Sequence, residues 1–341
     1  MEKSSMFKWA NQIINKTGFK NPKKIYQASS GNPHNLRNII YQGTYRDIPA
    51  VLKICDHLEN YGIREGESLF FFNQNNRSKK LIAPELYKHK QLSFWREWFI
   101  MEKLPADGRF LSEPEISKPL TQEERREFLE VYLEYKKYFP RKPWRPLLLA
   151  EKLPAHEFHL TRIRRWFEMA SDKEIESELG GKKSFLSAEL FLPLYLTALA
   201  LIRKEFKIRP KSWSHGHFKP KDIFYSPQKN VYYLTDFAHN YLYPEGYELA
   251  FMVWSDWLMG TDWRMSYPEW RKGINSWIKD LLPVAEKLKI KNPRQLLRVS
   301  LIERTLGAIL ADVIASGRPS KEKRARLNLL IHFLKDLIKN K

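Results

Sequence analysis

Two short stretches of the chain combine residue types that can bind phosphate and metal ions. The first is the loop-like run SHGHFKPKDIF at 214–224, which holds two histidines, two lysines and Asp222. The second is the apolar run YYLTDF at 232–237, in which Asp236 follows a strand-like segment. Two carboxylates, one on a loop and one at the end of a strand, can bind Mg²⁺ alongside phosphate oxygens. A loop that only connects two elements rarely needs this mixture, so we expect it to carry chemistry.

A lysine in the first part of the chain is a third candidate. Lys53 lies in the apolar run AVLKI, which is typical of a strand, so we expect its ammonium at the inner face of a sheet. A buried lysine needs an acidic partner, and Glu65 or Glu67 in the next helix-like segment can supply one. The alternative is that the side chain extends to water, as most lysine side chains do.

The first hundred or so residues have the pattern of an antiparallel sheet with one inserted helix. Extended runs on either side of Arg46-Asp47 predict a hairpin. The predicted elements lie at 24–29, 36–54 (the hairpin), 60–74 (the helix), 84–89 and 95–104. The proline-rich stretch 105–121 then predicts a hinge or domain boundary.

Beyond this stretch the pattern becomes helical. Thr121 followed by Glu124 is a capping box, which predicts the start of a helix over 121–139. The segment 187–206 is nearly apolar all round, which predicts a buried helix whose regular part begins at Pro193. Further helices are predicted at 156–170, 293–316 and 320–338. The order of elements predicts a β-rich domain over 1–104 and a helical domain over 105–341.

The composition is that of a globular protein with a strong excess of basic residues. The 341 residues are 43% hydrophobic and carry a net charge of +20. The start of the chain has no signal-peptide pattern, and the most apolar run is too short to span a bilayer, so we expect a cytoplasmic protein without a transmembrane segment. The single cysteine, Cys55, excludes an internal disulfide framework and a cysteine-rich zinc site.

The basic charge favours an anionic partner, and the sequence leaves its identity open. Nucleotide phosphates, a phosphorylated substrate, nucleic acid and anionic lipid are all candidates, and a generally basic proteome would give the same charge. Basic and apolar residues alternate in three clusters, at 142–146, 162–166 and 321–326. Such clusters occur on nucleic-acid-binding and lipid-binding surfaces, but more often they form a solvated face.

The order of these pieces resembles the aminoglycoside phosphotransferase and choline kinase family, a branch of the protein-kinase-like fold. The resemblance covers roughly residues 24–260. The matching pieces are the turn SGNPHN (30–35), the strand AVLKI (50–54), the helix start Arg64-Glu65, the hinge FIMEKLP (99–105), the loop HGHFKPKD (215–222), the strand end LTDF (234–237) and YELA (247–250).

The resemblance implies a small antiparallel β-sheet lobe and a larger, mostly helical lobe, an α+β fold. It implies ATP and Mg²⁺ as cofactors and transfer of a phosphoryl group to a hydroxyl of a small molecule or sugar. Glu65 would orient the phosphate-binding lysine, and His215 would brace the loop backbone. The site residues implied are Gly31, Lys53, Glu65 and Glu102 for the nucleotide, and Asp222 and Asp236 for the metal and catalysis.

The sequence departs from the family pattern in the catalytic loop. His217 stands where the family has its catalytic aspartate, and Asp222 stands where it has asparagine. A neutral imidazole can act as a base near neutral pH, which leaves room for an active enzyme with His217 as the base. The alternative is a pseudokinase that binds nucleotide without transferring phosphate, and a second alternative is a basic protein on nucleic acid or a membrane surface. A zinc site of His215, His217 and His239 is a minor alternative.

Overall fold

The computed structural model describes residues 3–29, 36–56, 64–93, 96–112, 119–139, 142–143, 147, 149–259, 263–315 and 320–339. The chain divides into two compact units. The first unit comprises Met1–Glu113, Val131–Pro140 and Pro220–Asn240, and the second comprises Pro114–Glu130, Arg141–Lys219 and Tyr241–Lys341. The late segment 220–240 therefore packs in the same unit as the N-terminal strands.

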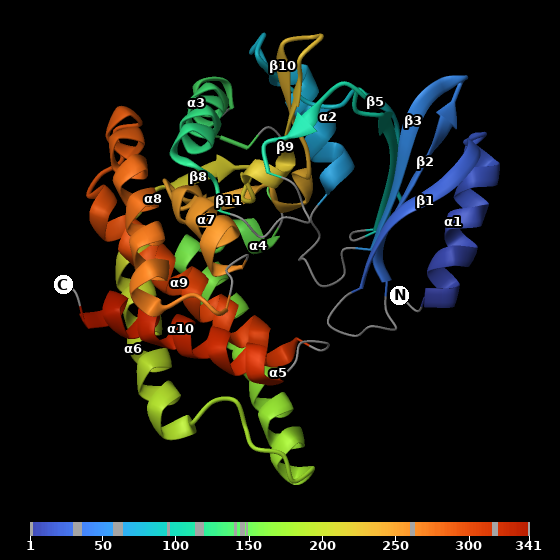
Figure 1. Cartoon of the computed structure of the whole chain (residues 1–341). Helices are drawn as coiled ribbons and strands as arrows, with labels where there is room; N and C mark the ends of the chain where they lie inside the picture. Colours follow the sequence, from blue (N-terminus) through green and yellow to red (C-terminus); the bar gives the residue numbers. More distant parts are fainter. Residues whose placement is uncertain are drawn as a thin grey trace. The chain divides into compact units, whose positions relative to one another are not determined.

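The first unit is built on a five-stranded antiparallel sheet, as the sequence predicts (Figure 1). Its strand order is β1-β2-β3-β6-β5, with bounds Lys20–Ser29, Leu36–Tyr45, Ile48–Asp56, Arg96–Glu102 and Leu86–Gln91. The hairpin predicted around Arg46-Asp47 is confirmed, because both residues have positive φ (52° and 62°) between the paired Tyr45 and Ile48. Positive φ at both central residues is the geometry of a tight two-residue hairpin turn.

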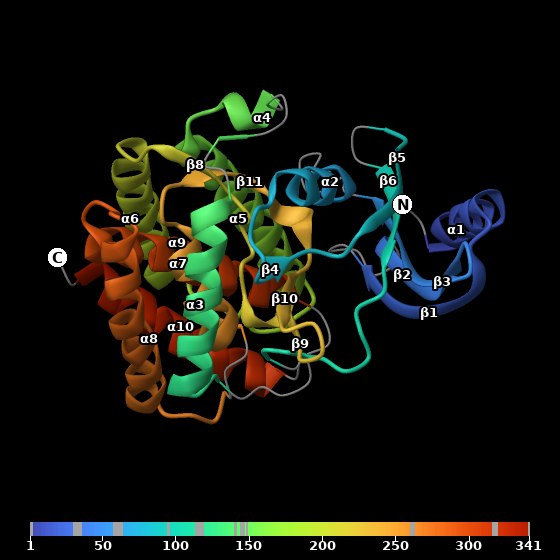
Figure 2. The same cartoon turned by 90° about the horizontal axis from the view of Figure 1, so that it is seen from above.

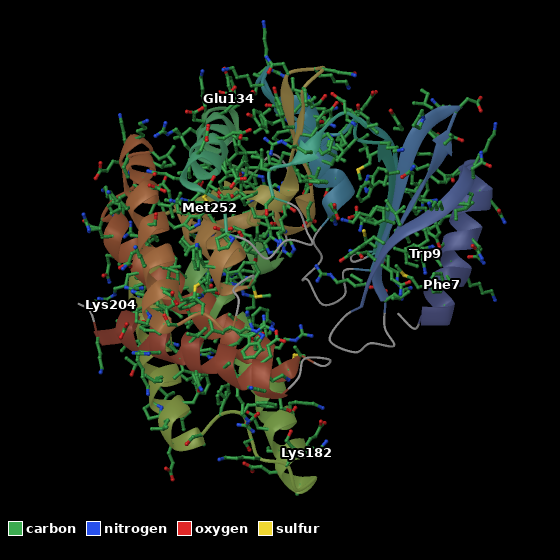
Figure 3. All side chains as sticks on the ribbon, in the orientation of Figure 1. Phe7, Trp9, Glu134, Lys182, Lys204 and Met252 are labelled. Atoms are coloured by element: carbon green, nitrogen blue, oxygen red, sulfur yellow. The ribbon has the colours of Figure 1, made fainter. Side chains whose placement is uncertain are left out.

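The helix α1 (Lys3–Thr17) lies alongside β1, β2 and β3 (Figure 2) and was not predicted. Its apolar side chains recur every three or four residues, which places them on the face that packs against the sheet. The buried members of this stripe are Met6, Ala10, Ile13 and Ile14. Phe7 and Trp9, labelled in Figure 3, are partly buried against the same core.

A second, four-stranded sheet in the first unit positions the end of the predicted metal strand. Its order is β4-β10-β9-β7, and β4 pairs with β10 in parallel. The bounds are Leu81–Ile82, Val231–Leu234, Ile223–Ser226 and Arg109–Phe110. Leu234 pairs with Ile223, so Asp222, which precedes Ile223, and Asp236, two residues after Leu234, lie at the same end of the β9–β10 hairpin.

The helix α2 (Glu65–Asn75) lies within the first unit, and α3 (Gln122–Tyr138) runs from the second unit into the first. The segment predicted for α2 includes residues 60–63, which lie outside the described residues. The predicted capping box of α3 is confirmed, because the Thr121 amide donates to Glu124 Oε2 (2.7 Å) and the Glu124 amide donates to Thr121 Oγ1 (3.3 Å).

The second unit is mostly helical, as predicted. Its long central helix α9 is buried over most of its length, and α10 packs along it. The helix α8 was not predicted, and α5 is longer than predicted. The bounds are α4 Leu149–Lys152, α5 Ala155–Leu179, α6 Ala188–Lys207, β8 Lys211–Ser214, β11 Tyr241–Pro244, α7 Glu248–Val253, α8 Tyr267–Lys287, α9 Pro293–Ile314 and α10 Ser320–Lys339. A π-helical turn, Trp254–Leu258, follows α7 directly.

The helix predicted over 187–206 is confirmed, but the predictions that it is buried and that its regular part begins at Pro193 are wrong. The helix α6 begins at Ala188 with Pro193 inside it. Its buried side chains, which include Tyr195 and Ile202, form one stripe, while Leu190 and Leu196 on other faces are 64% and 56% exposed. The apolar sequence therefore predicts that this segment is a helix, but it does not predict how much of the helix surface is buried by neighbouring elements. None of the helices in the described residues combines the length and the apolar character that a membrane crossing needs.

Candidate active site

Lys53 and Glu65 form a buried ion pair in the first unit. Lys53 lies in the fully buried end of β3, and Glu65 is the first residue of α2. The Lys53 Nζ atom is 2.7 Å from the Glu65 carboxylate, and the two residues are 7% and 4% exposed. Glu67, the other candidate partner, instead pairs with Arg64 at 3.2 Å. The alternative of a solvent-exposed Lys53 is therefore wrong.

Asp236 is a second acid close to the same ammonium. Its Oδ1 atom is 3.8 Å from Lys53 Nζ, and its side chain is 31% exposed. Burial disfavours the charged form of Lys53, but the carboxylates of Glu65 and Asp236 outweigh that cost and raise the pKa of Lys53 above its ordinary value. The lysine is therefore a permanent cation between two acids, one of which is accessible to solvent.

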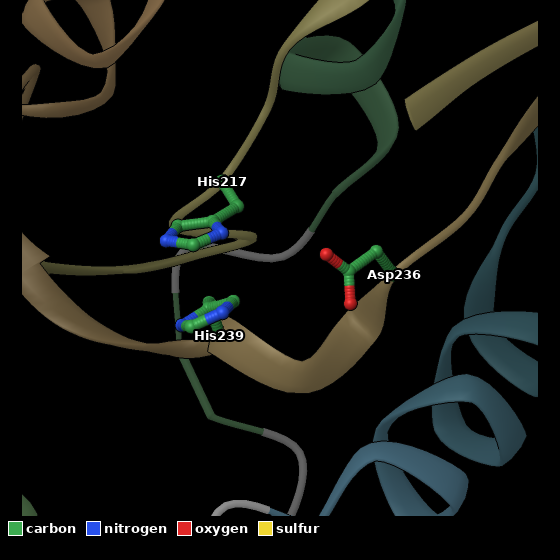
Figure 4. A group of neighbouring side chains, drawn as sticks. All are labelled: His217, Asp236 and His239. Carbon is green, nitrogen blue, oxygen red and sulfur yellow. The ribbon is translucent and has the colours of Figure 1, made fainter. Parts of the chain in front are cut away.

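The backbone at Asp236 has an unusual conformation. Its φ and ψ are 57° and 62°, in the left-handed region that few residues other than glycine adopt. The turn Phe237–His239 follows, and Phe237 packs against Phe72 of α2 with ring centroids 5.1 Å apart. The helix that carries Glu65 thus rests on the residue that follows Asp236. A carboxylate oxygen of Asp236 (labelled in Figure 4) and a ring nitrogen of His239 lie within 4.8 Å of each other.

Asp222 is held at the start of β9 and is 6% exposed. Its carbonyl oxygen accepts hydrogen bonds from the Thr235 amide at 2.9 Å and from Thr235 Oγ1 at 3.0 Å. These bonds fix the backbone of Asp222 opposite the residue that precedes Asp236. The two acids predicted for the metal therefore come from adjacent ends of one hairpin.

Glu97 positions the start of α2 and was missed by the sequence analysis. It lies on β6, is fully buried, and accepts hydrogen bonds from the amides of Glu65 at 2.6 Å and Gly66 at 3.1 Å. Its Oε2 atom is also 3.0 Å from His89 Nε2. A carboxylate at a helix N-terminus satisfies amides that lack partners within the helix. A signal was present, because REWFIME places an acid inside a strand of apolar residues.

Gly66 makes this contact possible. A Cβ atom at this position would lie 2.5 Å from the His89 ring and 3.1 Å from Glu97 Oε2. The absence of a side chain therefore allows the helix N-terminus to reach the carboxylate of Glu97.

Glu102, predicted to contact the nucleotide from the hinge, uses its carboxylate within the first unit. Its Oε1 atom accepts hydrogen bonds from Lys229 Nζ and from the Tyr233 hydroxyl, both at 3.1 Å, and its Oε2 atom accepts from the Glu85 amide at 3.2 Å. These contacts connect the end of β6 to the β9–β10 hairpin. Gly31, and residues 144–146 of the first basic cluster, lie outside the described residues.

The loop that holds His217 is fixed within the second unit by Gly216. Gly216 has a φ of 80°, and its amide donates to Glu248 Oε1 at 3.1 Å. Glu248 is 1% exposed. It belongs to YELA (247–250), one of the segments that resemble the phosphotransferase family. The imidazole of His217 (labelled in Figure 4) stacks on Phe251 with centroids 4.3 Å apart and an interplanar angle of 21°. His215, in the same loop, is fully buried.

The second and third basic clusters supply internal contacts, so a purely solvated face is wrong for Arg162, Lys323 and Arg326. Arg162 pairs with the buried Glu303. Arg326 Nε is 2.9 Å from Asp312 Oδ2, and both residues are buried. Lys323 donates to the Ala315 carbonyl at 2.6 Å, close to the end of α9. Part of the basic excess therefore stabilises the helical unit.

Glu303 is the centre of the most extensive of these clusters. It accepts hydrogen bonds from Arg162, from Arg304 Nε at 2.8 Å and from the Tyr247 hydroxyl, and it lies 3.1 Å from His159 Nδ1. Burial disfavours the charged form of Glu303, but the two guanidiniums more than compensate and hold its pKa well below the usual range.

Cys55, two residues beyond Lys53, is fully buried. Burial raises the pKa of its thiol well above the ordinary value. The thiol is therefore protonated at neutral pH and shielded from reagents.

Comparisons with known proteins identify the fold. No protein-family model and no curated protein sequence matches the chain. Among solved structures, it is similar to a mutant aminoglycoside phosphotransferase APH(4)-Ia in ternary complex with ADP and hygromycin B (TM-score 0.57, 11% identity, 96% of this chain and 97% of that chain). It is also similar to the choline kinase LicA from Streptococcus pneumoniae (0.53, 11%, 97% and 99%). A Plasmodium vivax ethanolamine kinase is a third neighbour (0.55, 12%, 97% and 90%).

The chain thus has the α+β, protein-kinase-like fold of the aminoglycoside phosphotransferases and choline kinases, and the predicted fold class is confirmed. At 11% identity the similarity establishes the fold alone. The aligned region covers 97% and 99% of the first two neighbours.

Proposed function

We propose that the protein is an ATP- and Mg²⁺-dependent phosphotransferase that acts on a hydroxyl of a small molecule or sugar. The observation that carries this proposal is the placement of Lys53 Nζ 2.7 Å from Glu65 and 3.8 Å from Asp236. Phosphoryl transfer depends on positioning and on compensation of phosphate charge. A buried lysine held between an inner acid and a solvent-accessible acid has the charge and the access that this task needs.

The residues fit the cofactors. Asp236 offers carboxylate oxygens, the ligand type that Mg²⁺ prefers, and its side chain is 31% exposed. We infer that Asp222 and Asp236 hold the metal, that Lys53 contacts phosphate oxygens, and that Glu65 orients the lysine. Bound Mg²⁺ would offset the negative charge of the triphosphate. Gly31 and Glu102 remain candidates for the turn over the nucleotide and for the hinge.

We further propose that His217 accepts the proton of the acceptor hydroxyl. Stacking on Phe251 limits rotation of the ring and fixes its plane. A histidine in this place also supports the second candidate function, a pseudokinase that binds nucleotide without transfer, because an imidazole is bulkier than the carboxylate that the family uses.

Nucleotide binding is tested by thermal unfolding with and without ATP–Mg²⁺. A ligand that binds only the folded state at one hundred times its Kd stabilises it by about 2.7 kcal/mol, so the wild-type chain should melt at a higher temperature. Lys53→Met and Asp236→Asn should lose this increase, whereas Lys204→Met, an exposed lysine on α6, should keep it. If ATP–Mg²⁺ leaves the wild-type melting temperature unchanged, both candidate functions are wrong.

Turnover separates the two candidates. ATP hydrolysis or acceptor phosphorylation that falls by at least about a hundredfold in His217→Ala, with ATP–Mg²⁺ binding retained, supports the enzyme. Binding of ATP–Mg²⁺ without any turnover by the wild-type chain supports the pseudokinase.

A further inference from the structure

A partly enclosed cavity of about 150 Å³ lies inside the second unit, and none of the residues discussed for nucleotide and metal lines it. It is bounded by α5, by the π-helical turn after α7, and by α9. Its surface is mostly apolar. The side chains that shape it are Ile163, Trp166, Trp254, Met259, Ala308 and Ala311.

The size and lining of this cavity suit a small flat ring. An apolar cavity on the order of 150 Å³ is large enough to bind benzene. Two indole rings contribute to its walls, and two alanines of α9 leave the space open. Met259, at the end of the π-helical turn, is 36% exposed, which gives the cavity a solvent-accessible side.

The charged residues beside the cavity disfavour a cationic ligand. Arg162 and Arg304 both line it and share one carboxylate, that of Glu303. His159, which also contacts Glu303, is neutral at physiological pH because burial lowers its pKa to about 4. The cluster therefore carries one positive charge in excess, and a like charge on a ligand would be repelled.

The cavity adjoins the histidine of the catalytic loop through a shared aromatic residue. Trp254 forms part of the cavity wall, and its ring centroid is 6.4 Å from that of His217. The ring of Phe251, which stacks on His217, also has its centroid 4.6 Å from that of Trp254. Trp254 begins a π-helical turn, a feature that is frequent at functional sites.

We propose that this cavity binds an aromatic ring of the phosphate acceptor, and that the ring carries no positive charge. The identification of the ligand as the acceptor rests on the proposed function. The ring-binding site itself depends only on the geometry of the second unit.

Three single-ring probes of similar size but different charge test the cavity: phenol, benzoate and benzylamine. Binding to the full chain, without nucleotide or metal, is measured by isothermal titration calorimetry and by the shift in melting temperature. We expect phenol or benzoate to bind and benzylamine to bind at least about tenfold more weakly. Equal affinity for benzylamine, or no binding of any probe at millimolar concentration, would overturn the proposal.

Filling the cavity provides the matched test. Ala311→Leu adds a side chain inside the cavity, and Ala200→Leu makes the same change on an exposed position of α6. The first variant should weaken ring binding by about tenfold or more, and the second should leave it unchanged. If Ala311→Leu does not fold, Ala308→Val adds less volume at the same wall. Ring binding that survives in the folded cavity-filling variant contradicts the assignment.

The outcomes for the cavity and for the proposed function are separable. ATP–Mg²⁺ binding without ring binding rejects the cavity proposal alone. Ring binding by a chain that does not bind ATP–Mg²⁺ rejects the phosphotransferase and the role of the ring as acceptor. Acceptance of phosphate by a phenolic or benzylic alcohol, lost in Ala311→Leu and kept in Ala200→Leu, supports both.

Discussion

The two units each contain a buried cluster of acidic and basic side chains, and the clusters differ in what they leave accessible. In the first unit, Lys53 lies between the buried Glu65 and Asp236, whose side chain is 31% exposed. In the second unit, Glu303 is 1% exposed and is surrounded by two guanidiniums, a tyrosine hydroxyl and an imidazole. The same residue types thus build a closed structural cluster in one unit and, in the other, a cluster with an accessible acid.

Neutralising the closed cluster should have the largest effect on stability. In Glu303→Gln, the buried Arg304 and the partly buried Arg162 lose their counter-ion, and loss of one partner of a buried ion pair costs about 3–5 kcal/mol. Urea unfolding should show this decrease in the free energy of unfolding. Asp236→Asn should cost much less, because Lys53 retains Glu65. If the two variants lowered the free energy of unfolding equally, the clusters would not differ in the way described above.

Acid should destabilise the closed cluster through His159. Burial lowers the pKa of His159 to about 4, although Glu303 opposes this effect, whereas an unfolded histidine titrates near about 6.5. As the pH falls between these values, only the unfolded chain gains the proton, so the stability contributed by neutral His159 is lost, by up to about 3 kcal/mol. Urea unfolding from pH 7 to 4.5 should show a shallower pH dependence in His159→Gln. An unchanged slope would exclude His159 as its source.

A substitution of Glu97 should disturb the first cluster without changing the side chain of Lys53, Glu65 or Asp236. In Glu97→Gln, the amides of Glu65 and Gly66 lose a charged acceptor, and hydrogen bonds to charged groups contribute about 1.5–3 kcal/mol each. We expect faster amide hydrogen exchange in α2 and weaker stabilisation by ATP–Mg²⁺. Exchange in α9 of the second unit serves as the internal control. Unchanged exchange in α2 would show that Glu97 does not hold the helix.

The smallest effect is expected for Glu67, which is a matched control for Glu65. Its pair with Arg64 is partly exposed (side chains 29% and 24%), and such pairs contribute about 0–1 kcal/mol. Glu67→Ala should therefore leave both unfolding and ATP–Mg²⁺ binding close to wild type. Glu65→Ala should impair both, and the reverse pattern would assign the lysine to the wrong glutamate.

The sequence allowed the first cluster to be predicted because its pieces have local signatures. Lys53 lies in an apolar strand, Asp236 follows another, and the hairpin turn at Arg46-Asp47 fixes the register of the first. The order of these motifs along the chain then matched the order in the aminoglycoside phosphotransferase and choline kinase family, which predicted that they lie together. The choice between Glu65 and Glu67 required the direction of each side chain around the helix, which the sequence left open.

The remaining features depend on partners that are distant along the chain. The carboxylate of Glu97 is used by a helix that begins more than thirty residues earlier, and the counter-ion of Arg162 is Glu303, in another helix. A basic run such as 162–166 does not reveal which of its members has such a partner. The exposure of Leu190 and Leu196 on α6 likewise depends on which helices pack against it.

The buried thiol of Cys55 has a practical consequence. Because it is the only cysteine in the sequence and is shielded and protonated, the wild-type chain should react slowly with maleimides at neutral pH. A cysteine introduced at an exposed position such as Leu196 would then be the single labelling site. A fluorophore or spin label could be attached there without first removing the native residue, which leaves the strand beside Lys53 intact.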